Sequence, residues 1–176
     1  DHSNNAARTT VLTNVLIANN TSIGSATSVG GGVSHGAGNL VLRNTTISGN
    51  STNDSGGGLL VTSGATATLI NTTISNNRAD ADNAGGGVGG AIRALAGGTV
   101  NLRNSILDGN KRTGAAVDEV NGAINADNSL IGNTTGATIV GAANHLNVSA
   151  RLAALADNGG QPVGPTGFTA VLQTHA

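Results

Sequence analysis

The nine residues LRNTTISGN at positions 42–50 decide the fold, because close copies of them return along the chain. The copies are LTNVLIANN at 12–20, LINTTISNN at 69–77, LRNSILDGN at 102–110 and the shorter ADNSLIGN at 126–133. Successive copies are offset by 30, 27, 33 and 24 residues, counted from the first asparagine of each. Repeats of this length are typical of solenoids, in which each repeat packs on its neighbours.

Apolar and polar residues alternate at the start of each copy, and a period of two indicates a β-strand. The predicted inward residues are Leu40, Leu42, Leu69, Leu102, Ile47 and Ile74. Glycine runs at 30–32, 56–58 and 85–87 provide corners that tolerate close backbone approach. We therefore predict an all-β, right-handed parallel β-helix of about five coils over residues 1–141. A C-terminal capping or docking extension covers 142–176, with a short helical face at 148–156.

The asparagine that closes each repeated strand is predicted to point inward, because it continues the alternation of the strand. These structural ladder residues are Asn14, Asn44, Asn71, Asn104 and Asn128. Stacked amides about 4.8 Å apart can bond to one another and to the turn backbone. Asparagine also tolerates the left-handed backbone that a sharp corner needs. A second asparagine follows at the next corner, at Asn20, Asn50, Asn77, Asn110 and Asn133.

Composition argues against several classes of function. The 176 residues carry a net charge of −1 with a single lysine, so a nucleic-acid partner is not expected. No apolar run approaches the length of a membrane span. Cysteine is absent, which excludes thiolate chemistry. Phe168 is the single aromatic residue, so the usual platform for stacking sugars is missing.

Several short motifs carry little chemical meaning in this context. Residues 32–36 match the G-x-S-x-G nucleophile elbow and residues 85–90 match G-x-G-x-x-G, but neither match precedes a predicted helix. The four histidines are scattered and are expected to be exposed. The acidic pairs Asp80/Asp82 and Asp118/Glu119 lie in variable loops, where solvated side chains are favoured over a Ca²⁺ site. We predict no catalytic residue, no cofactor and no metal.

Two stretches resemble known bacterial surface proteins. GGAI at 89–92, with ISGN at 47–50 and ISNN at 74–77, resembles the repeats of polymorphic outer membrane proteins. LAALADNGGQP at 152–162, followed by THA at 174–176, is similar to a stretch of choice-of-anchor Q domain proteins. The resemblance implies an exported right-handed β-helix. It implies a location outside the cell or on the cell surface, in a bacterium, after removal of a signal peptide that this chain does not contain.

The expected function is therefore that of a non-catalytic structural or adhesive β-solenoid, whose partner is a second copy bound end to end in a filament. Surface glycans or host proteins are further candidate partners. The alternative is a carbohydrate-active β-helix enzyme, a lyase or hydrolase, although no paired carboxylates are evident. Asn53 is the best candidate for glycosylation. The candidate self-association residues are Leu146, Leu152, Leu155, Phe168 and Leu172.

Overall fold

The computed structural model describes residues 8–23, 30–158 and 173–176, and these residues form an all-β fold with parallel, curled sheets. The first sheet contains β1 (Thr9–Thr13), β5 (Gly38–Arg43), β9 (Ala65–Ile70), β12 (Thr99–Arg103), β16 (Val120–Asp127) and β18 (Ala137–Val140). The second contains β2 (Leu16–Ala18), β6 (Thr46–Ser48), β10 (Thr73–Ser75), β13 (Ile106–Asp108), β17 (Leu130–Ile131) and β19 (His145–Leu146).

A third row of strands contains β4 (Val33–His35), β8 (Leu59–Val61) and β11 (Ile92–Ala94). It joins the first sheet through the long strand β16, whose start pairs with β11 and whose end pairs with β12. Two small pairs complete the strands: β3 (Thr21–Ser22) with β7 (Ser51–Thr52), and the antiparallel hairpin β14 (Lys111–Arg112) with β15 (Ala116–Val117). A 3₁₀ turn at Thr113–Ala115 connects the hairpin strands.

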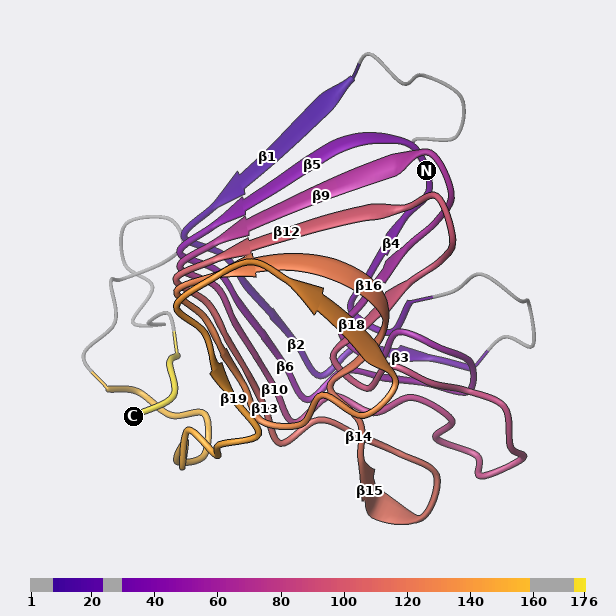
Figure 1. Cartoon of the computed structure of the whole chain (residues 1–176). Coiled ribbons are helices and arrows are strands. Elements are labelled where there is room, and N and C mark those ends of the chain that lie inside the picture. The colour runs from indigo at the N-terminus through magenta and orange to yellow at the C-terminus, as the bar shows by residue number, and fades with distance from the viewer. Residues whose placement is uncertain (1–7, 24–29, 159–172) are drawn as a thin grey trace, which may run out of the picture.

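Each strand of the two main sheets pairs with the matching residues of the next repeat. Leu42 lies opposite Leu69 in the first sheet, and Ile47 lies opposite Ile74 in the second. Figure 1 shows the two sheets meeting along one line of turns, with the third row of strands at their other side. The core lies between the rows, and all six residues predicted to point inward are buried.

Within the described residues, the C-terminal extension, residues 142–176, continues this pattern only as far as β19, which pairs in parallel with β17. Residues 148–158 contain no helix, so the predicted short helical face is wrong. Residues 148–158 and 173–176 instead lie along the outer side of the second sheet, where Ser149 contacts β13 and His175 contacts β6. Whether the extension caps the molecule or docks on a partner stays a prediction.

Candidate functional site

A ladder of asparagine amides, largely buried, lies at the second corner of the first four repeats, whereas Asn133 of the fifth repeat instead accepts the Thr135 N–H. Asn50 Oδ1 accepts from the backbone N–H and the Nδ2 of Asn20, at 3.0 and 2.8 Å. Asn77 Oδ1 accepts the same two bonds from Asn50, and Asn110 Oδ1 accepts them from Asn77, all at 2.9 Å. Because Asn50, Asn77 and Asn110 are fully buried, these bonds offset the cost of removing the amides from water.

Glu119 ends this ladder. Its Oε2 accepts from Asn110 Nδ2 at 2.5 Å, and its Oε1 accepts from the Asn110 backbone N–H at 3.3 Å. The side chain is completely buried, and burial raises the pKa of Glu119 to about 7, although the bonds from Asn110 oppose the shift. The ladder therefore has a direction: every amide donates toward the carboxyl group at its end.

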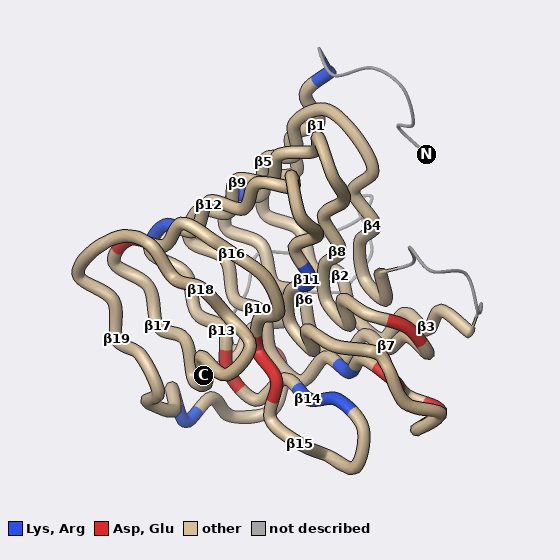
Figure 2. Tube along the Cα trace, turned by 45° about the vertical axis from the view of Figure 1, so that its right-hand side comes forward, with Lys and Arg blue, Asp and Glu red and all other residues tan. Residues whose placement is uncertain are grey.

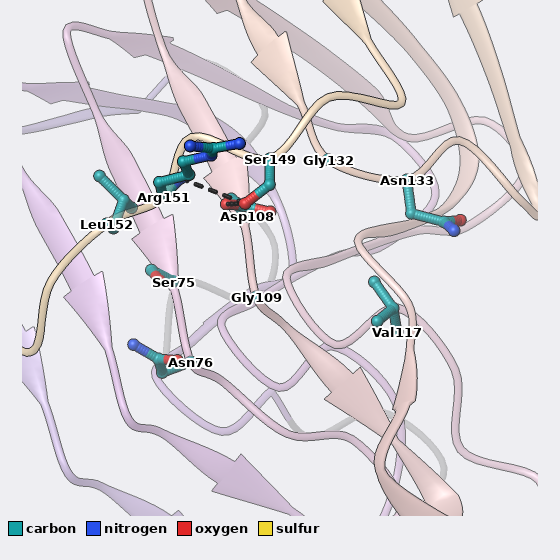
Figure 3. Close-up of a pocket in the computed structure, with 10 residues that line it drawn as sticks. All are labelled: Ser75, Asn76, Asp108, Gly109, Val117, Gly132, Asn133, Ser149, Arg151 and Leu152. Carbon is teal, nitrogen blue, oxygen red and sulfur yellow. Dashed lines mark hydrogen bonds between the residues drawn. The ribbon is translucent and has the colours of Figure 1, made fainter.

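The neighbouring carboxylate, Asp108, lies in a groove of about 440 Å³ (Figure 3). Its Oδ2 accepts from Ser149 Oγ at 2.9 Å and from the Ala150 N–H at 2.8 Å. A β-carbon at Gly132 would collide with Asp108 Oδ1 and would lie 3.4 Å from Glu119 Oε1, so both carboxyl groups converge on this glycine. Through the bonds that it accepts from Ser149 and Ala150, Asp108 attaches the C-terminal segment to β13.

A pair of neighbouring carboxyl groups is the usual equipment of a glycosidase, and Asp108 and Glu119 form such a pair. Glu119 has no exposed surface and is not part of the groove wall. A general acid must come within hydrogen-bond reach of the bond it protonates. Glu119 is sealed away from any ligand in the groove, so the pair does not support acid–base catalysis on a bound sugar.

Ser48 and His175 form a second pair of catalytic residue types. Ser48 Oγ lies 3.0 Å from His175 Nε2, and His175 Nδ1 lies 2.7 Å from the Ala153 carbonyl oxygen. A serine nucleophile also needs access to substrate and donors for the oxyanion. Ser48 is buried, and the adjacent Gly49 N–H already donates to Ser75 O. The contact supports attachment of the C-terminal segment rather than acyl transfer.

The first asparagine ladder lies elsewhere than predicted. Asn14, Asn44, Asn71, Asn104 and Asn128 are all exposed, so their predicted inward orientation is wrong. Each adopts the left-handed conformation, with φ from +48° to +56°, and this interrupts the alternation of the strand. Asn44 Nδ2 donates to Asn14 Oδ1 and Asn71 Nδ2 donates to Asn44 Oδ1, both at 3.1 Å, on the outer surface.

The residue after each of these asparagines points inward instead. Thr45, Thr72, Ser105 and Ser129 are buried, and each hydroxyl donates to the carbonyl oxygen two residues earlier. The hydroxyls of Ser105 and Ser129 also accept the backbone N–H of the preceding member at 3.1 Å. The sequence analysis missed this ladder of hydroxyl groups, although a threonine or serine follows the first asparagine in four of the five copies.

The other predicted site residues are dispersed. Asn53 is half-buried beside the 84–87 loop, and its glycosylation stays a prediction. Leu146 lies on the edge strand β19, whereas Leu152 and Leu155 lie half-buried in the C-terminal segment. Phe168 and Leu172 fall outside the described residues. Of the candidate self-association leucines that the structure describes, only Leu146 therefore lies on a sheet edge.

Two expectations about charged and titratable residues are wrong. His35 is buried, with Nε2 at 3.1 Å from the carbonyl oxygens of Gly38 and Thr66. Asp80, Asp118 and Glu119 are buried rather than solvated. Burial raises the pKa of Asp118 despite a bond from the Gly89 N–H and the nearby charges of Arg112 and Arg93. Figure 2 shows charges thinly scattered, with several near β13 and β14.

No family model, curated protein or solved structure matches the chain. Within the described residues, no group of three or more His, Cys, Asp or Glu side chains is placed to hold a metal ion. No helix in this part of the chain has the length and apolar character needed to cross a membrane.

Proposed function

We propose that the chain is a right-handed parallel β-helix that serves as an exported, non-catalytic structural or adhesive module and associates end to end. The strand order supports this architecture, because the chain visits the same rows of strands in turn and pairs each visit with the next in parallel. The C-terminal resemblance to choice-of-anchor Q domain proteins supports export.

The observation that supports this function is the incomplete burial of the apolar core at the ends of the stack of strands. Inside the stack, core residues such as Leu42 and Ile47 have no exposed surface. The partly buried apolar residues that pack against this core are all on strands at or near an end of the stack. They are Leu12, Ile17 and Val33 on β1, β2 and β4, and Ala137 and Ile139 on β18. Among the described residues the core is thus less covered at both ends of the stack, which favours a partner that continues it.

The two ends are different surfaces, one formed by β1, β2 and β4 and the other by β18 and β19. A contact between unlike surfaces is heterologous and gives a filament when its rotation does not close a ring. The net charge of −1 provides little repulsion between copies. Both properties support a filament of identical subunits, whose outer surface would carry any adhesive contact.

Analytical ultracentrifugation of the purified 176-residue chain over a range of concentrations tests the proposal, with negative-stain microscopy of the same samples. We expect concentration-dependent species larger than a monomer and, at high concentration, unbranched filaments. A strict monomer at every concentration would refute end-to-end association. Turnover of a polysaccharide panel by the purified chain would refute the non-catalytic assignment.

A further inference from the structure

The strand register extends one outward column of side chains from one edge of the first sheet to the other. It consists of Val11, Val41, Thr68, Asn101, Asn125 and Val140. The two valines at its ends are 54% and 59% exposed, and within residues 8–23, 30–158 and 173–176 each has a neighbouring strand on one side only. β-branched side chains pack well against their neighbours on the pleated surface of a sheet. The column therefore ends in a valine at each edge of the sheet.

An inward column of the second sheet has the same property. It consists of Ile17, Ile47, Ile74, Leu107, Ile131 and Leu146. The four central members are completely buried, whereas Leu146 is 39% exposed and Ile17 is half-buried. Covering either end would remove apolar surface from water.

The spacing of the two columns allows both edges to be covered at once. Val11 precedes Ile17 by six residues, and Val140 precedes Leu146 by the same six residues. The separation is also six in each repeat between them, as from Val41 to Ile47. The two edge residues on β18 and β19 are therefore separated by the same number of residues as those on β1 and β2. An additional repeat paired with β1 and β2 would have this separation too.

The polar ladders do not extend to this contact. Glu119 ends the amide ladder before the last edge, and the hydroxyl position is occupied by Val15 at one end and Asn144 at the other. Asn144 Oδ1 accepts the Ser129 N–H at 2.9 Å, so its oxygen is engaged within the molecule. Contact between the two edges would therefore rely on hydrogen bonds between strand backbones and on the apolar residues that end the two columns.

We propose that the partner is a second copy of this chain, held by parallel pairing of β18 with β1 and of β19 with β2. This register, which rests on the end-to-end association proposed above, places Val140 beside Val11 and Leu146 against Ile17. Every junction of the filament is then a continuation of both sheets. The amide ladder is interrupted at each junction, which makes the junction the weakest point of the assembly.

Disulfide trapping tests the register, because the chain contains no cysteine. Residues directly opposite each other on adjacent strands lie within the Cα distance that a disulfide spans. The double variant V11C/V140C should form covalent dimers, trimers and larger species after mild oxidation. The matched control V41C/V140C should remain uncrosslinked, because Val41 lies inside the sheet with a strand on each side. A mixture of the single variants V11C and V140C should stop at dimers.

The outcomes distinguish the proposed strand register from end-to-end association in general. A protein that associates, while V11C/V140C stays uncrosslinked and circular dichroism shows it folded, would overturn the register alone. Efficient crosslinking of V11C with itself would also overturn it, because that product requires like edges to meet. A strictly monomeric protein would overturn both proposals.

Discussion

Replacing Glu119 with glutamine should remove a pH dependence of stability that the wild-type chain shows between pH 4.5 and 7. The carboxyl group is buried at the end of the amide ladder, and its pKa is raised from 4.5 to about 7. Glutamine retains an oxygen that can accept from Asn110 Nδ2 but cannot ionise. Its NH2 group replaces the other oxygen, so the longer bond from the Asn110 N–H is lost, but that loss does not vary with pH and leaves the pH dependence of stability as a measure of Glu119 titration.

The sign follows from proton binding. Between pH 4.5 and 7 the unfolded chain releases the Glu119 proton and the folded chain retains it, so the free energy of unfolding falls as pH rises. Each pH unit in this interval is worth about 1.4 kcal/mol, so the wild-type chain should lose about 3 kcal/mol. Above pH 7 both states are ionised, and Glu119 should cause no further loss.

Urea unfolding followed by circular dichroism at several pH values from 4.5 to 8, at low protein concentration, measures the effect. The difference in slope between wild type and E119Q isolates Glu119, because Asp118, whose pKa burial also raises, remains in both proteins. The exposed Asp82 provides a control, and D82N should behave like wild type. Equal losses in wild type and E119Q would show that Glu119 does not titrate as a buried group.

Four further substitutions test the packing. Asn77→Ala should lower the free energy of unfolding by about 3 kcal/mol because it leaves buried ladder partners unpaired, whereas the exposed Asn71→Ala should cost below about 1 kcal/mol in the same urea titration. Equal costs would contradict the assignment of the inner and outer ladders. Leu69→Ala should cost about 2–5 kcal/mol through a core cavity, and an unchanged melting temperature would place Leu69 outside the core. Asp108→Ala should speed proteolysis of residues 148–158 several-fold by removing the acceptor for Ser149 and Ala150, and unchanged cleavage would show that this contact does not hold the segment.

The parallel β fold and its inward leucines and isoleucines could be predicted from sequence because the alternation is regular and repeats. Extending that alternation gave the wrong orientation for the first asparagine of each repeat, which faces solvent rather than the core. A residue with φ near +50° turns the chain, so the next residue, such as Thr45 after Asn44, takes the inward position. The left-handed tendency of asparagine was recognised, but its consequence for the following residue was not.

The site was harder to predict for a different reason. Glu119 follows Asp118 in a stretch without repeat character, and two adjacent acids between turns indicate a solvated loop. The antiparallel hairpin of β14 and β15 brings Glu119 back against Asn110, nine residues earlier. The ladder needs an acceptor at its end, and no local pattern indicates which residue supplies it. The C-terminal segment presents the same difficulty, since its bond between Ser48 and His175 spans 127 residues.

The direction of the amide ladder also constrains how such a protein can change length during evolution. Each member accepts from the repeat before it and donates to the repeat after it, so a duplicated unit between Asn50 and Asn77 would receive and pass on every bond. A unit duplicated after Asn110 would have to displace the carboxyl group that now closes the series. Tandem duplication is therefore expected to be tolerated upstream of Glu119, which fixes one boundary of an otherwise extensible gene segment.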